Sequence, residues 1–147
     1  ISILDGDVVR QNLSKGLGFS KEDRSTNVRR IGYVASEIVK HDGIVLCSNI
    51  APYDEDRISN RNLIENLGIY IQVYVKTELN DCEERDVKGL YKLARDGKIK
   101  HFTGISDPFE EPSLNELMIN GGNSTTIGAN VDRIIEYLVK NDTLIKQ

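Results

Sequence analysis

The stretch ISILDGD, residues 1–7, is a short apolar run that stops at two aspartates around a glycine. This pattern is typical of a buried parallel strand that delivers polar groups from its carboxyl end. A second apolar run, GIVLCSNI at residues 43–50, ends at Ala51-Pro52-Tyr53 and predicts another such strand. Because ligands of open α/β sheets bind at the carboxyl ends of strands, we expect a functional site there.

Helical patterns alternate with these strands. Apolar residues recur at helical spacing between residues 26 and 41, with Ser25 or Thr26 as the expected cap. Further helices are predicted over residues 54–66, 78–85, 90–96 and 127–139, and a third strand over residues 69–75. Strands separated by helices indicate an α/β fold with a parallel sheet covered on both faces, which we expect to form one domain over residues 1–147.

Residues 86–112, DVKGLYKLARDGKIKHFTGISDPFEEP, differ in composition from the rest. Lysines, glycines and prolines are interleaved there with Tyr91, Phe102 and Phe109. Loop-rich segments of this length inside a domain are usually functional or disordered, and the aromatic residues favour function. We expect this segment to be a basic lid.

Charge and composition exclude several classes of protein. The chain carries 19 basic and 23 acidic side chains, a net charge of −4, which argues against a nonspecific nucleic-acid or anionic-membrane binder. No apolar run approaches the roughly 20 residues that cross a bilayer. Cys47 and Cys82 show neither metal-ligand spacing nor a dense disulfide framework, and the first residues do not resemble a signal peptide. We therefore expect a cytoplasmic protein with reduced thiols.

The stretch LDGDVVRQNLSKGLGFSKEDRSTNVRR, residues 4–30, carries most of the candidate site. A turn around Gly6 explains Asp5, whereas Asp7 is also placed to orient an attacking hydroxyl or help arrange a metal ion. In an acidic protein, Arg10 and Arg24 flanking one loop favour a local phosphate or sulfate site. For Arg29 and Arg30 at the end of the stretch, a solvated helix surface is an equally good interpretation.

Two phenylalanines in polar surroundings suggest a clamp on an aromatic base. Phe19 lies between Gly18 and Ser20, and Phe102 lies within KHFTG, so two ring faces could sandwich one ligand ring. For Phe19, folding back onto the core competes with this role. His101 is expected to line the site, but two histidines do not make a metal cluster. The GLG of residues 16–18 lacks the spacing of a dinucleotide fingerprint, which excludes a Rossmann dehydrogenase.

Several strings along the chain, taken in order, resemble one family. They are LDGD, GLGFSKEDR, NVRRIG, IAPY, ERDVKGLYKLARDGKIK and FTGI. On these strings the sequence resembles the adenosine 5′-phosphosulfate (APS) kinases, or adenylylsulfate kinases. The resemblance implies a P-loop kinase fold, three-layer α/β/α with a parallel sheet and a basic lid, usually dimeric. The implied reaction transfers the γ-phosphate of MgATP to the 3′-hydroxyl of APS, giving 3′-phosphoadenosine 5′-phosphosulfate and ADP.

The resemblance also implies roles for individual residues. Asp7, with Asp5 beside it, would be the base or orienting carboxylate for the 3′-hydroxyl. The substrate-binding residues would be Arg10, Arg24 and Asn27 at the phosphosulfate, Phe19 and Phe102 around the adenine, Lys88 and His101 from the lid, and the backbone of Ile50 and Ala51. Arg85 would lie near the ATP base. Magnesium would enter with ATP, and the sequence assigns no residue to it.

Three departures from the family pattern bear on function. Val8 stands where the family often has asparagine, so substrate affinity is expected to differ. Ala51 replaces a serine found in many members, which closes a phosphoserine route at that position and requires direct transfer. The IAPY form suggests a chain fused to an ATP sulfurylase.

A G-x-x-x-x-G-K-[ST] loop, which cradles ATP phosphates, does not occur in these 147 residues. In the family this loop lies upstream of the LDGD strand, after a first strand. We therefore expect an N-terminally incomplete kinase domain that lacks the first strand and the P-loop. The 147 residues alone are expected to be inactive and poorly soluble, because a missing central strand would leave sheet edges unpaired.

Two rival functions stay open from the sequence. A non-catalytic domain that senses sulfonucleotides, fused to an ATP sulfurylase, fits the missing loop. A kinase for another small nucleotide, such as a nucleoside monophosphate, fits the α/β pattern and the arginines.

Overall fold

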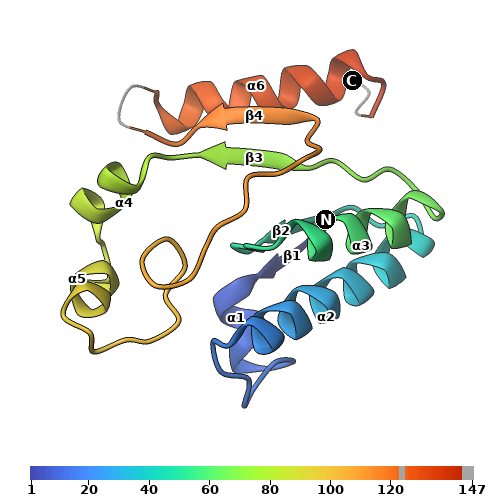
Figure 1. Cartoon of the computed structure of the whole chain (residues 1–147). Coiled ribbons are helices and arrows are strands. Elements are labelled where there is room, and N and C mark those ends of the chain that lie inside the picture. The colour runs from blue at the N-terminus through green and yellow to red at the C-terminus, as the bar shows by residue number, and fades with distance from the viewer. Residues whose placement is uncertain (123–124, 144–147) are drawn as a thin grey trace. The chain divides into compact units, whose positions relative to one another are not determined.

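A computed structural model describes residues 1–122 and 125–143, and these fall into two compact units (Figure 1). The first unit comprises residues 1–70 and 100–112, and the second comprises residues 71–99 and those from 113 onwards. The segment predicted to be the lid is thus divided: residues 86–99 belong to the second unit and residues 100–112 to the first.

The first unit is built on two parallel strands. β1 (Ser2–Asp5) pairs with β2 (Val45–Ser48), with Ser2 opposite Val45 and Asp5 opposite Ser48. Its helices are α1 (Gly6–Gln11), α2 (Lys21–Lys40) and α3 (Asp54–Glu65). The strands were predicted to be buried, and this is wrong: no residue of β1 or β2 is fully buried, and Ile3 and Leu46 are 69% and 56% exposed. Helices pack on one face of the pair, so side chains that alternate to the other face stay accessible.

α1 was not predicted. Asp5 ends β1 and at once caps α1, because its carboxylate accepts hydrogen bonds from the backbone N–H groups of Asp7 and Val8 at 3.0 and 3.2 Å. Val9 anchors the short helix in the core at 6% exposure. One apolar anchor in six residues is too little periodicity for a sequence pattern to reveal a helix.

α2 begins five residues earlier than the predicted start at Thr26. Its cap is Ser20, whose hydroxyl accepts a hydrogen bond from the Asp23 backbone N–H at 3.1 Å. Ser25, one of the two predicted caps, lies buried inside the helix instead, where its Oγ donates to Asp56 Oδ2 at 2.6 Å. The acidic first turn of α2 is polar on all sides, which hides it from a search for apolar periodicity.

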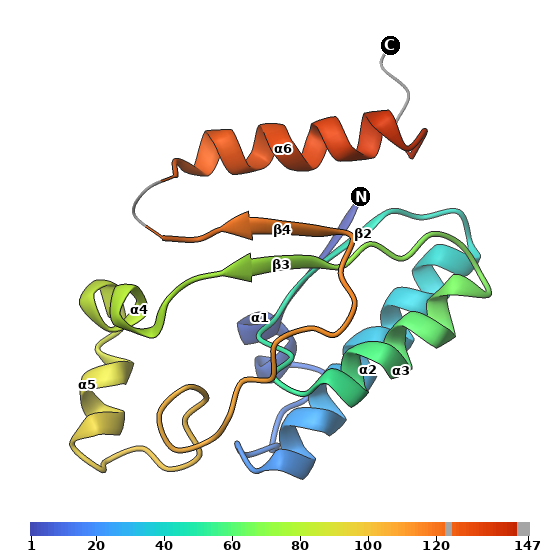
Figure 2. The same cartoon turned by 45° about the horizontal axis from the view of Figure 1, so that its top comes forward.

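α2 and α3 run side by side in both views of the chain (Figures 1 and 2). Ile31 and Ala35 of α2 and Ile64 of α3 are buried core residues. Gly32 permits the close approach, because a Cβ there would lie only 2.0 Å from Oδ1 of Asn60 on α3. α2 packs against both strands of the β1–β2 ladder, and α3 packs against α2.

The second unit is also built on two parallel strands. β3 (Val73–Lys76) pairs with β4 (Leu117–Asn120), with Val73 opposite Leu117. β3 lies at the end of the predicted strand 69–75, and β4 was not predicted, because LMIN is short and polar residues surround it. Its helices are α4 (Leu79–Arg85), α5 (Leu90–Arg95) and α6 (Ile127–Lys140), all near their predicted positions. α6 packs against β4 (Figure 2).

Parallel strands joined through helices recur in both units, so the predicted α/β class is confirmed. Both cysteines are free thiols, as predicted. No helix in the described part of the chain has the length and apolar character needed to span a membrane.

Candidate active site

The carboxyl ends of β1 and β2 bring the DGD turn beside the segment that follows β2. Asp5 and Ser48 are partners in the last step of the ladder. Gly6 makes the approach possible, because a Cβ there would lie 3.2 Å from the Ser48 carbonyl oxygen and 3.4 Å from Asn49 Cβ. Asp7 follows in the first turn of α1 with an exposed side chain. The structure therefore places Asp7 at the sheet edge where the sequence predicted a ligand.

Arg10, Phe19 and Arg24 form one cluster beside this edge. The guanidinium carbon of Arg10 lies 4.6 Å from the centre of the Phe19 ring, and that of Arg24 lies 5.4 Å from it. Arg10 also donates to the Gly18 carbonyl at 2.9 Å, and Arg24 Nε donates to the Phe19 carbonyl at 3.0 Å. Phe19 is 52% exposed, so it has not folded back into the core.

The electrostatics of this cluster favour an anion. Arg24 is only 8% exposed. Burial, and then the positive charge of Arg10, lower the pKa of the Arg24 guanidinium below its ordinary value. Two like charges beside one ring, one of them largely out of water, repel each other. The nearby Asp107 carboxylate offsets the loss of stability of the Arg24 charge only in part, and a negative group between the two guanidinium groups would relieve the repulsion. A phosphate or sulfate meets that need, since guanidinium groups bind these oxyanions in a bidentate manner.

Asn27 adds an unpaired polar atom to the same helix face. It follows Arg24 by three residues, which places both side chains on one face of α2. Asn27 is 5% exposed, and its Oδ1 has no hydrogen-bond partner. Buried polar atoms are rarely left unpaired, because losing water without a replacement partner is costly. A hydroxyl or amino group of a ligand could donate to this oxygen, whereas an oxyanion, which only accepts, would bind the amide N–H groups of Asn27 instead.

His101 reaches the cluster through its backbone carbonyl, and Phe102 follows it in the chain. The His101 carbonyl accepts a hydrogen bond from Arg24 NH2, and His101 Nδ1 lies 3.4 Å from Asp107 Oδ2. His101 has a φ of 56°, an unusual left-handed conformation for a non-glycine residue. The Phe102 N–H donates to Ser106 Oγ at 2.8 Å, which closes a tight turn over residues 102–107. Residues far apart in sequence thus meet at Arg24.

Ile50 and Ala51 follow β2. Ile50 is 62% exposed, and Ala51 is held at a φ of 41°, in the left-handed region that favours glycine. The Ala51 carbonyl accepts a hydrogen bond of 2.6 Å from Arg57 NH1 on α3. Strained backbone of this kind is concentrated at functional sites.

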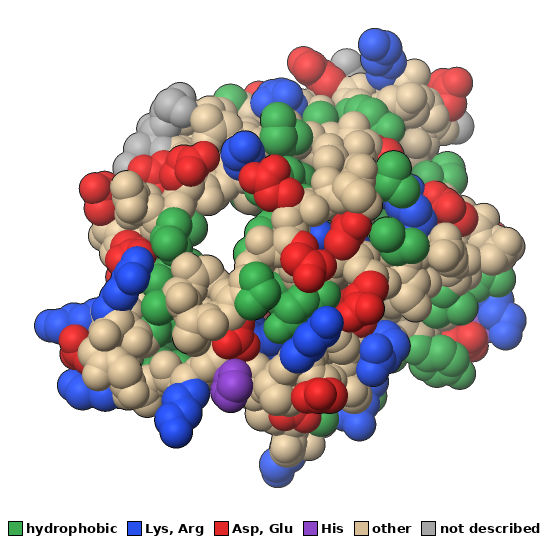
Figure 3. Space-filling model, in the orientation of Figure 1, with side chains coloured by type: hydrophobic (Ala, Val, Ile, Leu, Met, Phe, Trp, Pro, Cys, Tyr) green, Lys and Arg blue, Asp and Glu red, His purple; other side chains and the backbone are tan. Residues whose placement is uncertain are grey.

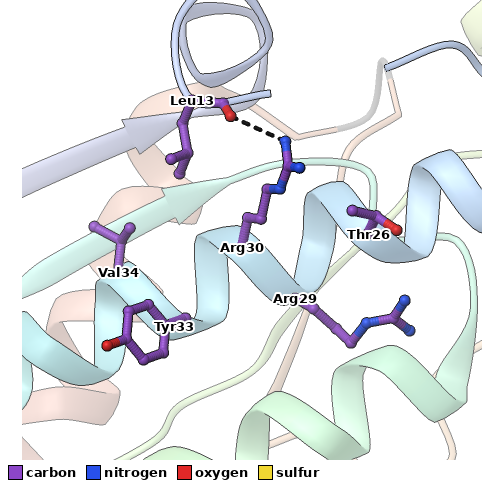
Figure 4. A pocket seen from close by; sticks show the side chains of 6 residues that line it. All are labelled: Leu13, Thr26, Arg29, Arg30, Tyr33 and Val34. Carbon is purple, nitrogen blue, oxygen red and sulfur yellow. Dashed lines mark hydrogen bonds between the residues drawn. The ribbon is translucent and has the colours of Figure 1, made fainter. Parts of the chain in front are cut away.

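Arg29 and Arg30, for which two interpretations stayed open, contact other groups. Arg29 NH1 lies 3.4 Å from the buried Asp56 Oδ1, and Arg30 NH1 donates to the Leu13 carbonyl at 3.0 Å. Both line a cavity of about 310 Å³ on the outer side of α2, together with Leu13, Thr26, Tyr33 and Val34 (Figure 4). In that view Arg30 points toward Leu13 and Arg29 extends toward α3.

Arg85 and Lys88 belong to the second unit. Arg85, at the end of α4, lines a cavity of about 610 Å³ at the carboxyl ends of β3 and β4. Thr77, Gly121 and Asn130 are further lining residues, and the sequence interpretation missed all three. Lys88 is exposed in the turn before α5, where Gly89 adopts a φ of 67°. Arg85 thus lies in a cavity of nucleotide size, while Lys88 contributes to the turn between α4 and α5.

Two further features of the described residues concern metal ligands and surface charge. Among the described residues, no group of three or more His, Cys, Asp or Glu side chains is arranged to hold a metal ion. On the face shown in Figure 3, basic and acidic side chains are interspersed. Interspersed charges on this face agree with the expectation, made from the net charge, that any anion site is local.

Sequence reasoning also missed two buried charged residues of α3, Asp56 and Arg57, which are 2% and 6% exposed. Asp56 accepts from Ser25 and faces Arg29, and Arg57 binds the Ala51 carbonyl. Both lie in the polar run DEDR, where nothing in the pattern distinguishes buried charges from solvated ones.

The first unit thus has parallel strands joined through helices, with Arg10 and Arg24 beside the carboxyl ends of the strands. Ligands of α/β proteins bind at such ends. The family model described as adenylylsulphate kinase matches residues 1–120. The chain belongs to the adenylylsulfate kinase family, and the predicted resemblance and P-loop kinase type of α/β fold are confirmed.

Individual relatives agree with this assignment. The adenylyl-sulfate kinase of Rippkaea orientalis is 58% identical over 117 residues, which cover 80% of this chain and 63% of that protein. This chain thus spans less than two thirds of that relative's length. The APS kinase CysC of Mycobacterium tuberculosis, solved in complex with AMPPNP and APS, has a TM-score of 0.87 and 38% identity, and the match covers 93% of this chain and 79% of that one. A hexameric APS kinase from Thiobacillus denitrificans has a TM-score of 0.72 and 34% identity, with 99% and 23% of the two chains covered.

Proposed function

We propose that this chain carries the APS-binding half of an adenylylsulfate kinase, which transfers the γ-phosphate of ATP to the 3′-hydroxyl of APS. The observation that carries the proposal is the Arg10–Phe19–Arg24 cluster beside Asp7. Two guanidinium groups face one exposed ring there, at the carboxyl edge of parallel strands. An anion joined to an aromatic base, as in APS, matches both features of the cluster.

In the proposed reaction the 3′-oxygen of APS attacks the γ-phosphorus of ATP. The bond from that phosphorus to the β–γ bridging oxygen breaks, and ADP leaves with the electron pair. Asp7 orients the hydroxyl and accepts its proton. Arg10, Arg24 and Asn27 hold the phosphosulfate, Phe19 and Phe102 bracket the adenine, and His101 and Lys88 contribute from the lid. Positioning and charge neutralisation supply the catalysis, since phosphoryl transfer demands little covalent work from the protein.

The proposed position of ATP is the cavity of the second unit that contains Arg85. Its volume suits part of a nucleotide, and Thr77 and Asn130 offer polar groups to a base. Magnesium enters as part of the MgATP substrate. Ala51 offers no hydroxyl for a phosphoserine intermediate, so transfer is direct between the two nucleotides.

Assembly and location are further parts of the proposal. We propose one kinase domain over residues 1–147 with its lid over about residues 86–112, a cytoplasmic homodimer, and a fusion to an ATP sulfurylase. The Thiobacillus denitrificans relative is described as hexameric, so the oligomeric state of this chain has to be measured directly. Light scattering of the purified protein distinguishes a dimer from a hexamer.

Two measurements test the function. The first is calorimetric titration of the chain with APS and, separately, with adenosine 5′-monophosphate, and we expect APS to bind more tightly. The second follows ATP-dependent 3′-phosphorylation of APS by the 147 residues and by the same chain extended with the coding sequence upstream of it. We expect turnover by the extended chain. Equal affinity for the two nucleotides would point to a different kinase, and tight APS binding without turnover would favour a sensing domain.

A further inference from the structure

Arg57 is a buried arginine of α3 that joins separate segments of the first unit. It is 6% exposed. Its NH1 donates to the Ala51 carbonyl at 2.6 Å, and its NH2 donates to the Glu110 carbonyl at 2.7 Å. Its charge is balanced on its own helix by Asp54, whose Oδ1 lies 2.9 Å from NH2. One guanidinium therefore connects the segment after β2, the start of α3 and the segment of residues 100–112.

The segment of residues 100–112 is bound at the same point by reciprocal contacts. The Asp54 N–H donates to Glu110 Oε2 at 2.7 Å, and the Glu110 N–H donates to the Pro52 carbonyl at 2.9 Å. The ring of Phe109 lies under the Arg57 guanidinium, 5.6 Å from ring centre to carbon. Arg57 is the centre of this junction, because its fork reaches both neighbouring segments at once.

Both segments carry residues of the candidate site. Ala51 belongs to the proposed pocket wall and adopts a left-handed backbone, which an alanine disfavours. The bond from Arg57 to its carbonyl helps to hold that conformation. The other segment carries His101 and Phe102 near its start and Glu110 near its end, and its His101 carbonyl accepts a hydrogen bond from Arg24.

We propose that Arg57 is a positioning residue for the APS site. It touches none of the groups assigned to the substrate anion. It fixes the carbonyl of Ala51 and the backbone of Glu110, and through them the pocket wall and the segment that presents His101 and Phe102. Lysine cannot replace it, since a single ammonium group lacks the planar fork that spans two carbonyls. The proposal rests on the proposed function, because the ligand it concerns is APS.

The test compares Arg57→Lys with a matched control, Arg61→Lys. Arg61 lies one turn further along α3, is 8% exposed, and binds Glu65 at 2.8 Å and the ring of Tyr70 at 4.8 Å. Calorimetric titration with APS is expected to show an affinity loss on the order of tenfold or more for Arg57→Lys, because misplaced binding groups are costly. Arg61→Lys is expected to bind like the wild type. Thermal unfolding of both variants reports any common loss of stability.

A rescue variant separates positioning from general stability. Ala51→Gly added to Arg57→Lys is expected to recover part of the lost APS affinity, since glycine adopts the left-handed backbone without strain. Deuterium exchange without ligand gives a further readout. Arg57→Lys is expected to speed exchange in residues 49–53 and 100–112, and Arg61→Lys is not.

The outcomes distinguish the two proposals. A wild-type chain that does not bind APS contradicts the proposed function, and the exchange experiment still decides whether Arg57 holds both segments. A wild-type chain that binds APS, with equal affinities and equal exchange for the Arg57→Lys and Arg61→Lys variants, overturns the positioning role.

Discussion

The guanidinium carbon of Arg10 lies 4.6 Å from the centre of the Phe19 ring. The exposed Phe19 ring, which the family resemblance assigns to the adenine of APS, thus contacts Arg10, which the resemblance assigns to the phosphosulfate. In the proposed APS site, recognition of the base and of the anion would be physically coupled, because movement of either side chain changes the cation–π contact of the other.

Phe19→Leu is expected to weaken APS binding by about 1 kcal/mol, roughly fivefold, because the ring contact to adenine and its support of two guanidinium groups are lost. Phe19→Tyr keeps the ring and is the matched control, with affinity expected to stay near that of the wild type. Calorimetry with APS measures both. Unchanged affinity in Phe19→Leu would show that the ring does not contact the base.

We expect the Asp5 carboxylate to have a structural role and the Asp7 carboxylate a catalytic one. Asp5→Ala removes the cap of α1 and is expected to lower the free energy of unfolding by about 1 kcal/mol, while Asp5→Asn retains an acceptor and most of that stability. Asp7→Asn is expected to leave stability within about 0.5 kcal/mol, as an exposed substitution. Urea unfolding measures these differences.

Turnover gives the complementary result for the same variants. In a chain that phosphorylates APS, Asp7→Asn is expected to lower kcat by on the order of a hundredfold or more, with a small change in KM for APS. Full activity of Asp7→Asn would remove Asp7 from the mechanism and direct attention back to Asp5.

Asn27→Leu is expected to separate stability from binding. The buried Oδ1 of Asn27 has no partner, so an apolar side chain of similar size should preserve or raise the free energy of unfolding, by up to about 1 kcal/mol. The same change should weaken APS binding, because leucine lacks the amide N–H donors that the proposed contact of Asn27 with the phosphosulfate requires. Ser14→Ala is the control: Ser14 Oγ is also buried and unpaired, at 1% exposure, but no site role is assigned to it. Lower stability together with unchanged affinity in Asn27→Leu would make Asn27 a structural residue.

The strands and long helices were largely predictable from the sequence because their patterns are local. Apolar runs that end at DGD and at APY located β1 and β2, and periodic apolar residues located most of α2. α1 and β4 escaped prediction, since a helix fixed by one carboxylate and a strand of four residues leave almost no periodicity.

The candidate site was predictable only where charge stands out against its surroundings. Arg10 and Arg24 are conspicuous in an acidic chain, and the structure brings them to one ring. Asp56 and Arg57 were not predictable, because their burial follows from packing between α2 and α3 and from the return of residues 100–112. Such tertiary contacts have no signature in the pattern of a single helix.

In the second unit, Asp86 fixes the turn that contains Lys88. Its carboxylate accepts hydrogen bonds from the backbone N–H groups of Tyr91 and Lys92 at 2.9 and 3.0 Å. These bonds, that of Lys92 foremost, hold the pKa of Asp86 below its ordinary value of 3.8. A depressed folded-state pKa means that the stabilisation is fully present above the unfolded-state pKa. It is lost as the pH falls through the lower, folded-state value.

The difference in unfolding free energy between the wild type and Asp86→Ala should therefore stay constant from neutral pH down to about pH 4, and shrink below it. Asp86→Asn compared with Asp86→Ala is the control. Neither variant titrates at this position, so the difference in unfolding free energy between these two variants should not shrink below pH 4. Urea unfolding at a series of pH values measures both differences. If the difference in unfolding free energy between the wild type and Asp86→Ala stays constant below pH 4, the charge of Asp86 does not hold the start of α5. Gly89 and the contacts of α4 would then set the turn instead.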